Sequence, residues 1–165
     1  MKVDTVAVAD CKDHARLFVS TNFPKVKHIF TDCRDLSGDV EKCCCCAGRC
    51  KFDRSHQPSL ATAGLPCQPF TGMRSTTGTG KNSGPPRRHK LYETYREFQM
   101  YLTTRQPHGF VVEEVTRILS VDHESGKRWL DLFLADAEHA GYKCSAVKLS
   151  ADPWTEVPRD RHGQS

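Results

Sequence analysis

The sequence predicts an α/β fold whose core is a doubly wound, mainly parallel sheet. Strand-like and helix-like segments alternate along the chain, one strand is a continuous apolar run, and polar or reactive residues follow the strand ends. The length of 165 residues suits one domain. We therefore expect a single domain over 1–165.

The first third of the chain predicts a strand, a helix, a second strand and an insertion. Residues 3–9 and 26–30 contain β-branched side chains, which favour strands. Between them, 12–22 has apolar residues at helical spacing and stops before Pro24. Residues 36–57 follow no period and include a cluster of cysteines. We expect an irregular, cysteine-rich insertion there.

The middle of the chain predicts a strand, a loop and a helix. The small residues of 60–64 form the strand, and the polar, glycine-rich segment after it predicts a mobile loop over about 67–90. A helix is expected over 89–104, because apolar residues recur there every three or four positions: Leu91, Tyr95, Phe98 and Leu102.

The last part predicts strand, helix and strand. Residues 109–115 are a continuous apolar run interrupted only by two acids near its end, which is typical of a parallel strand buried on both faces. Residues 124–140 have helical spacing, with Gly141 placed to cap the helix end. Residues 142–149 are expected to form the last strand.

Reactive side chains follow four of the predicted strands. They are Asp10, Asp32, Cys67, and the pair Glu113 and Glu114. Doubly wound sheets bind their ligands at the carboxyl ends of the strands. We therefore expect these residues to share one site.

The charge and hydropathy of the sequence limit the kinds of partner that the chain is expected to have. The net charge is +4, from 24 basic and 20 acidic residues, and a basic group lies within the glycine-rich loop: Lys81, Arg87, Arg88, His89 and Lys90. Such a group suggests nucleic acid, although a solvated basic loop is the alternative. No apolar run is long enough to cross a membrane, and we expect an intracellular protein without a membrane partner.

The nine cysteines cannot all pair, because their number is odd. Five lie within 43–50. Zinc binding by Cys43, Cys46, Cys50 and His56 is one alternative, but four consecutive cysteines cannot all point at one ion and no second Cys-x-x-Cys pair exists. We expect no metal site.

Three ordered motifs carry a family resemblance. They are Gly-Leu-Pro-Cys-Gln-Pro-Phe-Thr at 64–71, Phe-Val-Val-Glu-Glu-Val at 110–115 and Val-Pro-Arg-Asp-Arg at 157–161. Together they resemble the Pro-Cys-Gln, Glu-Asn-Val and Pro-Gln-x-Arg motifs of the cytosine-C5 DNA methyltransferases. The resemblance implies a Rossmann-like fold, S-adenosylmethionine as methyl donor, and a cytosine flipped out of duplex DNA as target.

The chemistry of this reaction suits the residue types. Cytosine C5 is a weak nucleophile until a thiolate attacks C6, and Cys67 would supply that thiolate. Glu113 would bind the ring at N3 and the exocyclic amine. Arg161 is the third residue expected to assist catalysis, and it would also contact the nucleotide.

The resemblance also implies binding residues. Those expected to touch the target nucleotide or its phosphates are Pro66, Gln68, Thr71 and Arg161. Those expected to hold the donor are Asp10 and its neighbour Cys11, Asp32 and Leu91.

The sequence departs from the family in ways that leave more than one function open. Glu114 replaces the family's Asn, and neither the first strand with its glycine-rich turn nor the target-recognition region is found. We expect a partial catalytic domain whose two groups of strands are separated, and in a split enzyme a second chain would complete it. A tRNA methyltransferase is less favoured than a DNA enzyme, because that branch's Cys-Phe-Thr signature is absent after Glu113. A non-catalytic fragment or partner of a complete methyltransferase is the third function. In a eukaryote we expect nuclear localisation.

Overall fold

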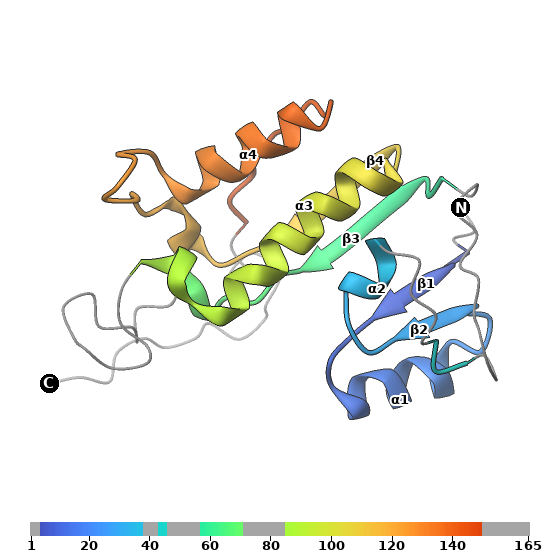
Figure 1. Ribbon diagram of the computed structural model, residues 1–165. Helices are drawn as coiled ribbons and strands as arrows, with labels where there is room; N and C mark the ends of the chain where they lie inside the picture. The colour runs from blue at the N-terminus through green and yellow to red at the C-terminus, as the bar shows by residue number, and fades with distance from the viewer. Residues whose placement is uncertain (1–3, 38–42, 46–56, 71–84, 150–165) are drawn as a thin grey trace, which may run out of the picture.

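The computed structural model describes residues 4–37, 43–45, 57–70 and 85–149 (Figure 1). Its strands form two separate parallel sheets, each of two strands. In chain order the helices and strands are β1 (Ala7–Ala9), α1 (Asp13–Asn22), β2 (His28–Phe30), α2 (Arg34–Ser37), β3 (Leu60–Gly64), α3 (Glu93–Arg105), β4 (Gly109–Glu113) and α4 (Trp129–His139). Four short 3-10 turns complete the order: η1 (Gln68–Phe70), η2 (Pro86–Arg88), η3 (Lys90–Tyr92) and η4 (Thr116–Leu119).

The first sheet pairs β1 with β2, with Val8 opposite Ile29. Both strands are shorter than the sequence predicts, while α1 matches its prediction within one residue. Phe30 is fully buried at the centre of a small core. By contrast Leu17 and Phe18, which gave α1 its apolar spacing, are exposed.

The expectation of an irregular insertion over 36–57 is wrong at its start. Helix α2 covers the first residues, and Cys43 is buried against Phe30 and forms an isolated antiparallel bridge with it. The Cys44 N–H donates to the Ile29 carbonyl at 2.7 Å. This segment therefore covers the outer edge of β2. The cluster's remaining cysteines lie outside the described residues.

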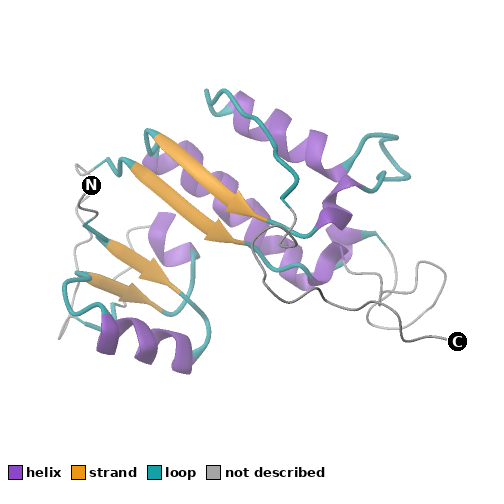
Figure 2. Ribbon diagram, turned by 180° about the vertical axis from the view of Figure 1, so that it is seen from behind, coloured by secondary structure: helices purple, strands orange, loops and turns teal. Residues whose placement is uncertain are grey.

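The second sheet pairs β3 with β4 over five residues, with Thr62 opposite Val111 and Gly64 opposite Glu113. Helix α3 covers one face (Figure 2). Its buried side chains meet the sheet through Phe98, whose ring lies edge-on to Phe110 with centroids 6.0 Å apart. The main core continues from there to α4 through a group of buried residues: Phe70, Tyr95, Phe98, Leu102, Ile118, Trp129, Phe133 and Ala137.

The other face of this sheet is bare within the part of the chain that the structure describes. Val111 is 57% exposed and Leu60 is 55% exposed. Side chains alternate between the faces of a strand, so Phe110 and Val112 point to α3 while Val111 and Glu113 point away from it. The prediction that 109–115 is buried on both faces is therefore wrong.

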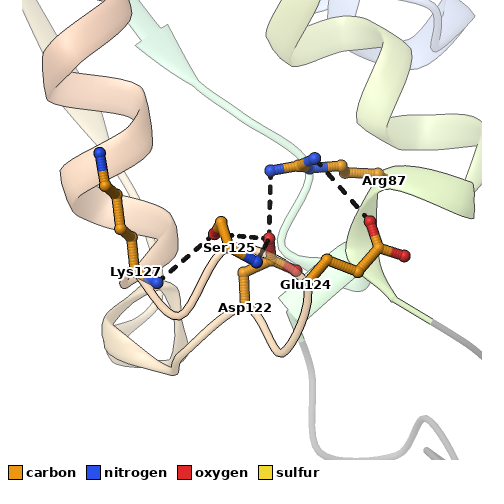
Figure 3. A network of polar contacts seen from close by, with 5 residues as sticks. All are labelled: Arg87, Asp122, Glu124, Ser125 and Lys127. Atoms are coloured by element: carbon orange, nitrogen blue, oxygen red, sulfur yellow. Dashed lines mark hydrogen bonds and ion pairs between the residues drawn. The ribbon is translucent and has the colours of Figure 1, made fainter.

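Helix α4 begins at Trp129, five residues later than predicted. The residues just before the helix form a turn around Asp122. The Asp122 carboxylate accepts hydrogen bonds from both the N–H and the hydroxyl of Ser125 (Figure 3). Gly126, with φ of +69°, allows the chain to reverse before the helix. The predicted C-cap is confirmed, since Gly141 has a φ of +95°.

The predicted strand over 142–149 is wrong. These residues follow α4 as irregular chain, and Val147 and Leu149 are exposed. Tyr142 is fixed at the start of this segment, because its hydroxyl donates to the Pro107 carbonyl at 2.8 Å. A strand forms only when a neighbouring edge accepts its hydrogen bonds, and none of the described strands pairs with this segment.

The two sheets present neighbouring edges. In both views β1 and β3 are the nearest strands of the two pairs, and they point in the same direction (Figures 1 and 2). Helix α2 contacts both β1 and α3 and so links the two halves. The predicted separation of the strand groups is confirmed, whereas the doubly wound sheet stays a prediction. No helix of the described ranges has the length and apolar character to span a membrane.

Candidate active site

Cys67 lies in the turn between β3 and η1. The Phe70 N–H donates to its carbonyl at 2.9 Å and closes this turn. Phe70 is buried, with its ring edge-on to Tyr95 at 5.2 Å and tilted against Trp129 at 5.9 Å. Cys67 itself is half-buried. The aromatic core therefore holds the turn from behind and leaves the thiol accessible.

Glu113 reaches the same end of the same sheet. It is the last residue of β4 and pairs with Gly64, three residues before Cys67. A Cβ built on Gly64 would lie 3.7 Å from the Glu113 Oε2 atom, so the carboxylate lies against this glycine. Cys67 and Glu113 therefore both lie at the carboxyl end of this sheet, where the sequence predicted these two residues.

Glu114 occupies the opposite, α3 side of β4. Its Oε1 is hydrogen-bonded to the Tyr95 hydroxyl, and its Oε2 accepts from the Val115 N–H at 2.8 Å. The same Tyr95 hydroxyl contacts the Pro66 carbonyl at 3.1 Å. The sequence pattern predicted Tyr95 only as an apolar residue of a helix. Its hydroxyl lies on the apolar face of that helix and so requires a polar partner, which was the signal that could have predicted this contact.

Burial raises the pKa of Glu114 above its usual value, and the nearby Glu113 carboxylate adds to the rise. The hydrogen bonds from Tyr95 and from the Val115 N–H oppose it. The net result is a pKa of Glu114 above its usual value.

Glu114→Gln should make the thermal stability of the protein less dependent on pH. The folded protein holds the Glu114 proton more tightly than the unfolded chain, so the wild type loses stability as pH rises from the usual glutamate range through the raised pKa. Below that window the two proteins should melt alike. At pH 7 the variant should melt roughly 1–3 °C higher, a small effect because Glu114 is only half-buried.

Thermal unfolding followed by circular dichroism between pH 4 and 8 measures this difference. The matched control is Glu138→Gln, an exposed glutamate of α4. Parallel curves for the wild type and the Glu114 variant across the whole range would contradict the prediction.

Asp10 and Asp32 follow β1 and β2 and therefore belong to the first sheet. Asp10 accepts from the Lys12 N–H at 2.7 Å. Asp32 binds the Arg34 side chain at 3.0 and 2.6 Å, and this contact lowers the pKa of Asp32. The expectation of one site in one continuous sheet is corrected: the structure forms two groups, each at the carboxyl end of its own sheet, because β1 and β3 are not paired.

The remaining predicted donor residues divide between these groups. Cys11 is exposed directly after Asp10. Leu91 is half-buried in η3, which contacts η1 immediately after Cys67. Leu91 therefore belongs to the Cys67 side.

Two further cysteines near the sheets are poorer nucleophiles. Burial, together with the neighbouring Asp32 carboxylate, raises the pKa of Cys33 to about 11. Burial also raises the pKa of Cys144. Since the thiolate is the reactive form, both are held as thiols at neutral pH.

The basic group has a partly structural role. Arg87 binds the buried Asp122 at 3.1 Å and lies over the Trp129 ring at 5.2 Å, so it anchors η2 to the turn before α4 (Figure 3). Arg88 and Lys90 are exposed. Several predicted residues lie outside the described ranges: Thr71, Lys81 and Arg161, and, for the zinc alternative, Cys46, Cys50 and His56.

Comparison with known proteins agrees with this geometry. No curated protein gives a significant match to the sequence. The family model described as C-5 cytosine-specific DNA methylase matches residues 1–162, nearly the whole chain. The described elements include parallel strands with helices between them, and they present Cys67 and Glu113 together at one sheet end. The chain belongs to the C-5 cytosine-specific DNA methylase family.

Proposed function

We propose that this chain carries the catalytic residues of a DNA (cytosine-5-)-methyltransferase, which transfers a methyl group from S-adenosylmethionine to C5 of a flipped cytosine. The observation that carries the proposal is the pairing of Glu113 with Gly64 at the end of the sheet, three residues before Cys67. A nucleophile and a ring-binding acid in one place are what the reaction needs.

Cys67 begins the reaction. Its thiolate Sγ forms a bond to C6, and the C5–C6 double-bond electrons move into the ring toward N3. Glu113, protonated at its carboxyl, donates to N3 and accepts from the exocyclic amine, which stabilises the negative charge placed on the ring. After C5 has been methylated, loss of the C5 proton to a base restores the double bond and expels the Cys67 thiolate.

The donor supplies an electrophilic methyl group on a sulfonium. The chemistry of the first sheet fits its nucleoside: Asp10 and Asp32 offer carboxylate oxygens that accept from ribose hydroxyls and from an adenine amine. Asp10 keeps one carboxylate oxygen beyond its bond to the Lys12 N–H. Leu91 would contact the donor from the Cys67 side.

In this proposal the two donor-binding groups belong to one doubly wound, Rossmann-like sheet. We infer that a parallel strand between β1 and β3 joins them. Their neighbouring edges lie side by side and point in the same direction (Figure 2). A second chain is one source of this strand.

DNA is the substrate that the family favours, and the exposed Arg88 and Lys90 support contact with phosphates. Pro66, Gln68, Thr71 and Arg161 would surround the flipped nucleotide. An intracellular location, nuclear in a eukaryote, follows as part of this proposal.

The test is covalent trapping. The chain, alone and mixed with a candidate partner carrying the missing strand, is incubated with labelled S-adenosylmethionine and duplex DNA containing 5-fluorocytosine. Fluorine replaces the C5 hydrogen and cannot leave as a proton, so the last step is blocked. An active enzyme therefore remains bound as an adduct of protein, DNA and methyl group. An adduct with DNA supports the proposal, and one formed only with tRNA moves the substrate to the tRNA branch.

Failure to form any adduct, with donor binding shown separately by calorimetry and with the partner present, would overturn the catalytic proposal. It would favour a non-catalytic partner of a complete methyltransferase. The separation of the two sheets is the observation that supports this second function.

Glu113→Gln should lower the rate of methyl transfer roughly 10²- to 10³-fold, because an amide cannot deliver a proton toward N3. The fall should appear in kcat more than in KM for DNA. Glu138→Gln is again the control, since this exposed acid lies on α4. Unchanged kcat in Glu113→Gln would remove the proposed role.

A further inference from the structure

Three segments meet at one hydroxyl group. Tyr95, on α3, contacts the Pro66 carbonyl at 3.1 Å and is hydrogen-bonded to Glu114 Oε1. Pro66 is the residue before Cys67, and Glu114 is the residue after Glu113. The hydroxyl therefore connects the backbone just before the proposed nucleophile to the side chain of the residue just after the proposed ring-binding acid.

We propose that Tyr95 and Glu114 form a proton-dependent relay to the Pro66 carbonyl that positions Cys67 against Glu113. The inference rests on the proposed function, because it assigns positioning residues to the same site. It concerns the loop's geometry, which can be measured without methyl transfer.

Hydrogen-bond accounting makes the relay depend on a proton. The Pro66 carbonyl only accepts, and the tyrosine hydroxyl has one hydrogen to donate. Glu114 Oε2 already accepts from the Val115 N–H, which leaves Oε1 for Tyr95. When Glu114 is neutral, it donates to the Tyr95 oxygen and Tyr95 donates to Pro66, so all three groups are satisfied.

Ionised Glu114 breaks this chain of bonds. The carboxylate and the Pro66 carbonyl then compete for one hydrogen, and a charged acceptor binds a donor more strongly than a neutral carbonyl does. The Pro66 contact is the one that should be lost. The Cys67 turn would then keep the hydrogen bond from the Phe70 N–H that closes it.

The Tyr95 ring is well fixed. Its residue is 3% exposed, and the ring contacts Phe70 at 5.2 Å and stacks on Tyr92 at 5.4 Å. The hydroxyl therefore cannot follow Pro66 or Glu114 if either one moves. A change in the hydrogen bonds of Tyr95 should therefore move the Cys67 loop and not the tyrosine ring.

The charged and titratable groups around Glu114 are few among the described residues. Glu113 precedes it on β4 and acts on it through its charge, and the Tyr95 hydroxyl faces it from α3. Cys67 lies in the loop near Tyr95. Burial and the Glu113 charge raise the pKa of Glu114, in the direction that the relay requires. Within the described ranges, the groups that lower this pKa are the Tyr95 hydroxyl and the Val115 N–H, both of them neutral donors.

The test measures the reactivity of the Cys67 thiol with iodoacetamide as a function of pH. Trypsin releases Cys67 as the only cysteine of residues 55–74, so its alkylation is followed by mass spectrometry in the full chain. Cys11, exposed beside the first sheet, is the internal control. The variants are Tyr95→Phe, which keeps the ring and removes the hydroxyl, and Glu114→Gln, whose amide donates at any pH.

In the wild type, the Cys67-to-Cys11 rate ratio should step upward at least about threefold as Glu114 ionises and the turn loosens. Tyr95→Phe should show the higher ratio at every pH, and Glu114→Gln the lower one without the step. Melting curves confirm that each variant is folded at the temperature used. If all three folded proteins share one pH profile, the relay is wrong.

The outcomes separate the relay from the proposed function. A covalent adduct with fluorinated DNA together with identical alkylation profiles would support the proposed methyltransferase and contradict the proposed relay. The reverse combination, distinct profiles without any adduct, would keep the relay as a structural device in a non-catalytic chain.

Discussion

Replacing Cys67 by serine should abolish covalent trapping and reduce methyl transfer by at least about 10³-fold. A serine hydroxyl is not ionised at neutral pH and is a far weaker nucleophile toward C6 than a thiolate. The fold should not change, because Cys67 is half-buried in a turn held by Phe70. Adduct formation on gels and methyl incorporation into DNA measure the two effects.

Cys144→Ser is the matched control. Cys144 is also half-buried, it borders the main core, and burial keeps it as a thiol. Its replacement should leave adduct formation intact. If Cys67→Ser retained trapping, or Cys144→Ser lost it in a folded protein, the nucleophile would have to be reassigned.

Asp122→Ala should destabilise the protein more than any of the substitutions at the site. The Asp122 side chain is 1% exposed and accepts from Arg87 and from the N–H and hydroxyl of Ser125 (Figure 3). Alanine leaves these donors without their acceptor. We expect a loss of about 2–4 kcal/mol, below the full cost of breaking a buried pair because the Arg87 side chain is 39% exposed.

The expected melting temperature falls by roughly 5–15 °C, which differential scanning calorimetry measures. The control is Asp131→Ala, which also removes an aspartate bound to an arginine, Arg128 at 2.7 Å, but from an exposed pair at the start of α4. It should change the melting temperature little. Equal effects of the two substitutions would show that burial of Asp122 contributes nothing.

Asp122→Ala should also affect the candidate active site around Cys67. Arg87 lies in η2, which contacts both η1, the turn that directly follows Cys67, and η3. Without its carboxylate partner, Arg87 retains, among the described residues, the Trp129 ring and the weaker contact to Glu124 at 3.9 Å.

Local patterns predicted several elements well. Strand 60–64 has the predicted bounds, and α1 differs by one residue at its start. Helix α3 begins four residues late because η3 occupies its first turn. These elements follow from apolar spacing and from clear stop signals, which are properties of short stretches of chain.

The failures share a physical cause, since contacts with residues distant in the sequence take part in each of them. Residues 142–149 contain strand-forming side chains, but a strand requires an edge to pair with. The apolar run at 109–115 does not reveal that only one of its faces is covered, by α3. Helix α4 starts late because Asp122 is committed to Ser125 and Arg87.

The sequence by itself determined the family and the order of the reactive residues. Cys67 in its Pro-Cys-Gln turn and Glu113 at a strand end are local features, and a parallel pair of strands with the predicted order brings them to one edge. Only the tertiary structure decided what holds them there. The contact of Tyr95 with both Pro66 and Glu114 joins three segments far apart in the chain, and hydrogen bonds between such segments exist only once the backbone has folded.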